Sequence, residues 1–223
     1  MVGKARARNF EDKQARRESI LNEALALWEE VSYPDFTMSA LAGRLGLAKG
    51  TLYLYFPTKE ELFLTLYERL LQTWFDELEA ALARRAGWSP DGVAEVMAES
   101  LVRHPALTRL IPLLEGILEH NISLEKALAY KTWLLEQVGR VGAKLEAALP
   151  YLSPGDGIRV LVYLQALTCG LVQMGTPAPV VRQVLQNPEL RVLEVEFGPA
   201  LRQGLTALLR GMKPKISKAA LLD

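Results

Sequence analysis

The feature that most constrains the fold of this chain is residues 37–62, which read TMSALAGRLGLAKGTLYLYFPTKEEL. Thr37 is a favourable N-cap, because its hydroxyl accepts a hydrogen bond from an amide of the first helical turn. Gly46 stands where that helix would end, since glycine adopts the left-handed backbone that terminates helices. Three apolar residues between them share one helical face: Leu41, Ala42 and Leu45. The pattern predicts a short helix closed at both ends.

A second short helix is expected at about residues 49–55, with Lys49, Gly50 and Thr51 at its start and aromatic residues at its end. Leu47 fills the angle between the two helices. Two short helices joined by a tight turn are typical of a helix-turn-helix, whose second helix enters the DNA major groove with its N-terminal residues. This pattern is weak by itself, so the surrounding sequence matters.

The segment before the helix-turn-helix is basic. We expect residues 1–10 to form a disordered arm that either stays in solvent or contacts the DNA backbone, and residues 11–32 to form a helix. Glu11 and Asp12 are the acidic residues among the first 17, against Lys4, Arg6, Arg8, Lys13, Arg16 and Arg17.

A long helix is expected from Thr58 to about residue 84. Thr58 is its N-cap, and Glu60 and Glu61 lie in the first turn, where carboxylates interact favourably with the helix dipole. Lys59 lies in the same turn, where the dipole disfavours a cation. A phosphate bound at this helix N-terminus would account for Lys59.

The rest of the chain also has helical patterns, so we predict an all-α protein. After a linker at residues 87–90, helices are expected at residues 91–103, 106–111, 112–120, 124–149, 157–174, 179–186 and 198–211, and residues 212–223 are expected to fray. The helix at 124–149 is predicted to bury one stripe, made of Leu124, Leu128, Leu135, Val138, Val141 and Leu145. The helix at 157–174 is apolar nearly all round, which indicates burial on two sides, one of them against another subunit.

Composition excludes several classes of protein. The net charge of the 223 residues is zero, so binding to DNA requires a local excess of basic residues. Cys169 is the single cysteine, which excludes an intrachain disulfide and a cysteine metal cluster; it is expected to be a small buried hydrophobe. The most apolar segment, residues 160–174, is judged too short to span a bilayer. No cofactor, metal or membrane is expected, and the predicted location is cytoplasmic.

The chain resembles the TetR family of bacterial transcriptional regulators over residues 15–65. Two positions depart from the family pattern: Ala48 stands where a capping serine or threonine is common, and Leu47 stands where valine is usual. The residues that carry the resemblance are Ile20, Leu21, Ala24, Leu27, Thr37, Met38, Leu41, Ala42, Leu45, Gly46, Leu47, Lys49, Gly50, Thr51, Leu52, Tyr53, Tyr55, Phe56, Lys59, Glu60, Glu61 and Leu62.

The resemblance implies an N-terminal three-helix DNA-binding domain and a larger C-terminal helical domain for ligand binding and dimerisation. The expected division is residues 1–58, including the basic arm, then 59–212, then a flexible tail at 213–223. Lys49, Gly50 and Thr51 would face base edges, and Thr37, Tyr53, Tyr55 and Lys59 would contact phosphates. Residue spacing alone favours core packing for Tyr53 and Tyr55, but the resemblance to the family favours phosphate contacts for both. Phe56 is assigned to the core.

The resemblance also implies an effector cavity among the C-terminal helices. Each candidate has an alternative: the aromatic residues and the methionine are often core, Glu115 can face solvent, and the histidines can simply end helices. A zinc site at the histidines lacks a third ligand. The candidates are Tyr67, Trp74, His104, Glu115, His120, Tyr130, Trp133 and Met174.

These features favour a homodimeric repressor that binds a palindromic operator and is released by a largely apolar small molecule. The half-sites of that operator would lie about 34 Å or more apart. An all-helical enzyme or carrier is the main alternative, but the chain shows no paired carboxylates, nucleophile with a base, or phosphate loop. A transcriptional activator or an architectural DNA-binding protein is a further alternative.

Overall fold

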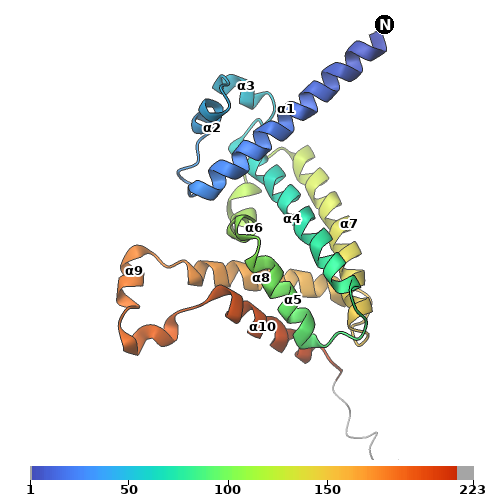
Figure 1. The fold of residues 1–223 in the computed structure, drawn as a ribbon, viewed down its shortest axis with the longest axis vertical. Coiled ribbons are helices and arrows are strands. Elements are labelled where there is room, and N and C mark those ends of the chain that lie inside the picture. Colours follow the sequence, from blue (N-terminus) through green and yellow to red (C-terminus); the bar gives the residue numbers. More distant parts are fainter. Residues whose placement is uncertain (1, 215–223) are drawn as a thin grey trace, which may run out of the picture. The chain divides into compact units, whose positions relative to one another are not determined.

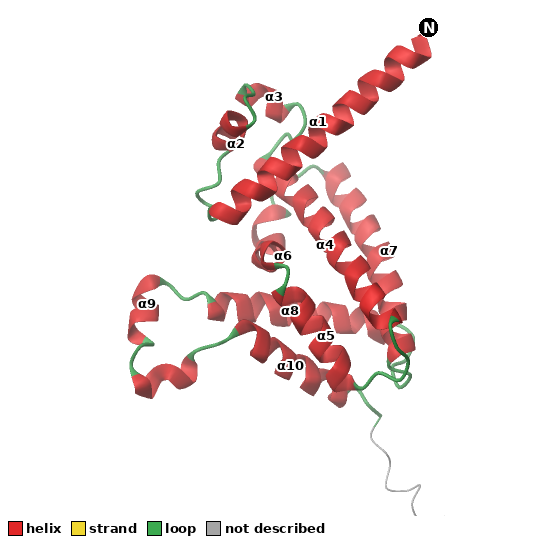
Figure 2. Cartoon of the chain, in the orientation of Figure 1, coloured by secondary structure: helices red, strands yellow, loops and turns green. Residues whose placement is uncertain are grey.

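The computed structural model describes residues 2–214, with side chains from residue 11 onward, so most of the expected tail at 213–223 lies outside the described residues. Within that part every regular element is helical and none is a strand, which confirms the all-α prediction (Figures 1 and 2). The elements are α1 Val2–Glu30, α2 Met38–Arg44, α3 Lys49–Tyr53, α4 Lys59–Ala83, α5 Pro90–Val102, α6 Pro105–Leu110, η1 Ile111–Leu113, η2 Leu114–Leu118, α7 Leu124–Ala148, α8 Asp156–Gly175, α9 Pro179–Val184, η3 Pro188–Leu193 and α10 Phe197–Gly211.

The chain divides into two compact units. Unit 1 comprises Met1–Leu70 and Leu113–Leu128, and unit 2 comprises Leu71–Pro112 and Ala129–Asp223. The helix-turn-helix therefore shares its unit with a short internal segment that includes the π-helix η2 and the first turn of α7. The division expected at residue 58 stays a prediction about domains.

The expectation of a disordered N-terminal arm is wrong. α1 is one helix from Val2 to Glu30. Lysine, arginine, alanine, glutamate and glutamine, which dominate its first half, all have high helix propensity. Whether this segment contacts DNA stays a prediction.

Unit 1 is built around Phe63 of α4, which is fully buried. Its ring meets those of Trp28, Tyr33 and Phe36 edge-on, with centroid distances of 5.3, 4.9 and 4.6 Å. Edge-to-face contacts of this kind stabilise a core beyond the burial of area alone. They join the end of α1 and the turn before α2 to α4.

The predicted apolar stripe of α7 is only partly correct. Val141 and Leu145 are buried, but Leu124, Leu128 and Leu135 are 87, 67 and 67% exposed. The buried face continues through Gln137 and Tyr130 instead. Two apolar faces overlap on this helix, and residue spacing alone does not decide which of them is packed.

In unit 2, α7 and α8 approach very closely through a pair of glycines. A Cβ built on Gly157 would lie 2.1 Å from the carbonyl oxygen of Gly142. Glu146 accepts hydrogen bonds from the amides of Gly155 and Gly157, at 2.8 and 3.0 Å. This carboxylate caps the N-terminus of α8, where the helix dipole favours a negative charge.

α8 is buried on one side within the single chain. Val160, Leu161 and Leu164 are buried, whereas Val162 and Tyr163 are 58 and 40% exposed. Residues 160–174, expected to be too short to cross a membrane, belong to a longer helix: α8 has the length and apolar composition of a membrane span, which core helices of soluble proteins share. Cys169 on this helix is half-buried.

Candidate nucleic-acid interface

α2 begins and ends as its sequence predicts. The hydroxyl of Thr37 accepts a hydrogen bond from the amide of Ala40 at 3.1 Å. Gly46 has φ of 63°, and the amides of Gly46 and Leu47 donate to the carbonyls of Gly43 and Ala42 at 3.2 and 2.9 Å. These two bonds form a Schellman motif, which fixes the turn into α3.

α3 presents its first residues to solvent. Ala48 is its N-cap and makes no side-chain capping bond, as expected from the missing hydroxyl. Leu52 is fully buried and anchors the helix, whereas Lys49 and Gly50 are exposed. No heavy atom lies within 4 Å of a Cβ built on Gly50, so the protein leaves this face of α3 open.

The aromatic residues at the end of α3 divide between core and surface. Phe56 is 1% exposed, which confirms its assignment to the core. Tyr53 is 40% exposed and Tyr55 is half-buried. Leu54 between them is 78% exposed, which its sequence did not indicate, because apolar residues in a short helix are usually core. An exposed leucine here can contact a thymine methyl group.

Lys59 has a partner within the protein. Its ammonium group donates to the carbonyl oxygen of Tyr33 and lies 3.8 Å from the centroid of the Tyr33 ring. Burial lowers the pKa of Lys59, while the nearby carboxylates of Glu60 and Asp35 act in the opposite direction. This contact with the turn after α1 explains why a lysine occupies the first turn of α4, so a phosphate contact by Lys59 stays a prediction.

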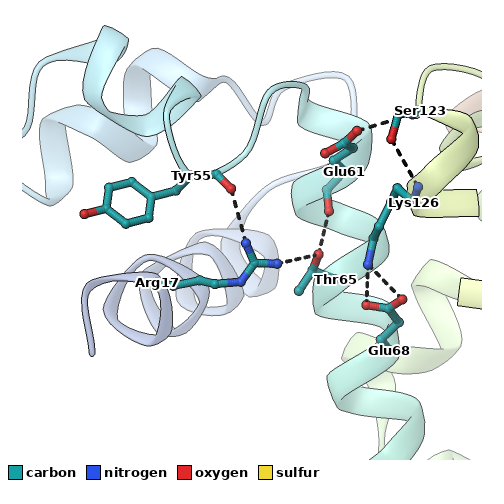
Figure 3. A network of polar contacts seen from close by, with 7 residues as sticks. All are labelled: Arg17, Tyr55, Glu61, Thr65, Glu68, Ser123 and Lys126. Carbon is teal, nitrogen blue, oxygen red and sulfur yellow. Dashed lines mark hydrogen bonds and ion pairs between the residues drawn. The ribbon is translucent and has the colours of Figure 1, made fainter. Parts of the chain in front are cut away.

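Arg17 links three segments around the end of α3 (Figure 3). Its guanidinium donates to the carbonyl oxygen of Tyr55 at 3.2 Å and to the hydroxyl of Thr65 at 3.4 Å. It also stacks over the ring of Phe56, 4.4 Å from the centroid. The sequence showed Arg17 as one of several basic residues, but its role in positioning α3 depends on contacts 38 and 48 residues away.

The first turn of α7 is tied to α4 within unit 1 (Figure 3). Ser123 caps α7 by accepting from the amide of Lys126 at 3.1 Å, as its position predicts, and its own amide donates to Glu61 at 3.3 Å. The Lys126 ammonium contacts both carboxylate oxygens of Glu68, at 2.8 and 2.7 Å. Because the hydroxyl of Thr65 also donates to the carbonyl oxygen of Glu61 at 2.8 Å, a continuous set of polar contacts runs from Ser123 through α4 and Arg17 to the residues that follow α3.

Four of the candidate effector residues are buried or paired in the single chain. Tyr67, Trp74 and Tyr130 are no more than 2% exposed. The indole of Trp74 donates to the hydroxyl of Ser100 at 2.9 Å, and His104 contacts the carboxylate of Glu77 at 2.9 Å. Trp74 thus has a clear structural role in the core of unit 2.

The other candidates do not gather at one interior site. Glu115, His120 and Met174 are exposed, and Trp133 is half-buried. Tyr67, Glu115 and His120 belong to unit 1, while the remaining candidates belong to unit 2. Depressions of about 440 and 610 Å³ lie between α5 and α10, but none of the candidates lines them. An effector role for these residues stays a prediction.

Two family profiles together cover most of the chain. Residues 20–66 match "Bacterial regulatory proteins, tetR family", and residues 68–215 match "Tetracyclin repressor-like, C-terminal domain". The chain belongs to the TetR family. It is a transcriptional regulator with a DNA-binding helix-turn-helix, and the proteins of its family and fold are regulators rather than enzymes.

Three relatives of known sequence or structure share between 16 and 23% of their residues with this chain. A "Fatty acid metabolism regulator protein" of Bacillus subtilis (strain 168) is 23% identical over 176 residues, which are 79% of this chain and 80% of the relative. The fatty acid degradation regulator FadR from Bacillus halodurans superposes with a TM-score of 0.54 at 16% identity, covering 87% of this chain and 97% of FadR. A TetR transcriptional regulator from Rhodococcus sp. RHA1 superposes with a TM-score of 0.54 at 22% identity, covering 89 and 95%.

Proposed function

We propose that this regulator is a cytoplasmic homodimeric repressor that binds a palindromic operator through α3 and is released by a small molecule. The observation that carries the proposal is the open face of α3, where Lys49 and Gly50 are exposed on a helix anchored by Leu52. Lysine donates to guanine, and glycine lets the helix approach the bases closely. Thr51, Tyr53 and Leu54 add a hydroxyl, a phenol and an apolar contact.

Phosphate contacts fix the register of such a complex. The hydroxyl groups of Thr37 and Tyr53 are on exposed side chains and can donate to phosphates of the DNA backbone. The phenol of Tyr55 can do the same from a half-buried position. We expect Lys59 to make a weaker phosphate contact than these three residues, because its ammonium group already donates a hydrogen bond to the carbonyl oxygen of Tyr33. A phosphate would have to share that ammonium group with the carbonyl.

We propose further that the effector carries a long apolar chain and that the operator controls genes of fatty acid metabolism. Support comes from the names of the Bacillus subtilis and Bacillus halodurans relatives, which are regulators of fatty acid metabolism and of fatty acid degradation.

Release would follow from a change in the position of α7. The bonds from Ser123 and Lys126 to α4 make the start of α7 part of the DNA-binding unit. An effector that binds one arrangement of α7 more tightly shifts the population toward that arrangement. Repression is lost when the favoured arrangement holds the two copies of α3 at a spacing that the operator does not match.

A gel shift on the DNA that flanks the gene tests both parts of this proposal. We expect the wild type to bind a palindrome there at moderate salt, and long-chain fatty acids or their acyl thioesters to release it. The double variant Tyr53→Phe, Lys59→Ala should weaken binding. Absence of any bound palindrome contradicts the DNA-binding role, and unchanged binding by the variant contradicts the residue assignment. A reporter assay in a deletion strain separates repression from activation.

A further inference from the structure

Residues 176–196, which we call the α9 arm, connect α8 to α10 and project from the rest of unit 2 (Figure 1). No residue of the arm is buried in the single chain. The arm nevertheless carries a set of exposed aliphatic side chains: Val180 (66% exposed), Val181 (44%), Val184 (53%), Val192 (86%) and Leu193 (63%).

The arm has a defined local structure in spite of this exposure. Pro179 opens α9, and the side chain of Asn187 caps η3 by accepting from the amide of Glu189 at 3.1 Å. Gly175 closes the base of the arm, where a Cβ would lie 3.2 Å from the carbonyl oxygen of Val195. Helices as short as α9 are marginal in water without packing. The arm has no buried residue to supply that packing, which leaves its aliphatic side chains available to another surface.

Charge narrows the choice of partner. Arg182 and Arg191 are outnumbered within the arm by Glu189, Glu194 and Glu196, which leaves the arm with a net charge of −1. A net negative charge provides no attraction to DNA or to an anionic lipid surface. The exposed aliphatic residues of the arm instead favour contact with an apolar surface on another protein molecule.

We propose that the α9 arm packs on a second copy of this chain and clasps it in the homodimer. The proposal rests on the proposed function, which requires a dimer. The arm begins at the C-terminal end of α8, whose exposed Val162, Tyr163 and Met174 offer an apolar face to the same partner. A stable interface uses about 20–30 residues on each side, more than one face of α8 supplies. The arm provides the additional surface, and two-fold symmetry makes the contact twice.

Sedimentation equilibrium of the full chain tests this inference. The double variant Val192→Ser, Leu193→Ser should raise the dimer Kd about 100-fold or more, because each lost contact occurs twice. The matched control is Leu124→Ser, Leu128→Ser on α7. Its side chains are 87 and 67% exposed, against 86 and 63% in the arm, and it should leave the Kd unchanged. Circular dichroism should show the same helical content for all three proteins.

The outcomes separate this inference from the function on which it rests. A dimeric wild type with an unchanged Kd in the arm variant overturns the clasp and leaves the repressor proposal intact. An equal effect of the α7 control also overturns it, because the effect would not belong to the arm. A monomeric wild type at micromolar concentration overturns the dimeric function itself. As a second readout, trypsin should cut after Arg182 and Arg191 much more slowly in the dimer than in the monomeric variant, and rapid cleavage in the dimer contradicts the clasp.

Discussion

Individual residues around α3 have separate roles that substitutions can distinguish. Leu52 and Phe56 hold the helix in the core, Arg17 fixes its end, and Lys49 with Gly50 faces outward. The fold therefore depends on one set of side chains and the proposed DNA contact on another. Variants of the second set should change DNA affinity without changing stability.

Gly50→Ala tests the close approach of α3 to DNA. The added methyl group meets no protein atom within 4 Å, and alanine favours a helix by about 1 kcal/mol over glycine. We expect an unchanged or slightly higher melting temperature together with a loss of DNA affinity of about tenfold or more, measured by fluorescence anisotropy. Gly43→Ala in α2, which is equally open, is the control and should keep its affinity. Equal affinity of both variants would contradict a close contact at Gly50.

Arg17→Met tests whether the end of α3 needs its guanidinium. Methionine preserves apolar contact with Phe56 but removes the donors to Tyr55 and Thr65. We expect DNA affinity to fall about tenfold, with the free energy of unfolding reduced by about 1–2 kcal/mol for the lost charged hydrogen bonds. Arg16→Met removes the same charge from an exposed neighbour. If the DNA affinity of both variants falls by the same factor, the lost positive charge alone accounts for the weaker binding, and the position of Arg17 does not matter.

Among the helices, the caps and turns could be predicted from the sequence, whereas contacts between residues far apart in the chain could not. The caps at Thr37 and Ser123 and the turn at Gly46 depend on bonds to residues within five positions. The partner of Lys59 is Tyr33, 26 residues away, and no local pattern indicates it. The buried face of α7 was likewise undecided, because which apolar face is packed depends on the neighbouring helices.

The crossing of α7 and α8 depends on Gly157. A methyl group there would overlap the carbonyl of Gly142, and overpacking of this kind usually costs about 1–3 kcal/mol. We expect Gly157→Ala to lower the melting temperature by several degrees, measured by circular dichroism. Gly139→Ala on α7, where no atom lies within 4 Å of the new Cβ, should be neutral or stabilising. A stable Gly157→Ala protein would show that the helices separate without cost.

At the scale of the whole molecule, the proposed function requires two copies of the chain. The TetR family acts through dimers on DNA operators, and a two-fold dimer reads the same half-site twice. The second apolar face of α8 was predicted from its composition, whereas the α9 arm was not recognised as a surface, because residue spacing in short helices does not show which side chains stay exposed. They now provide specific residues for testing how the dimer forms.

Selection of bound sequences from a random pool of duplex DNA tests the central claim most directly. We expect the wild type to enrich a palindrome with half-sites about 34 Å or more apart. Lys49→Ala should change the preferred bases within each half-site and retain the spacing between half-sites. Enrichment of no palindrome, or an identical preference in wild type and Lys49→Ala, would contradict the assignment of α3 as the element that reads DNA.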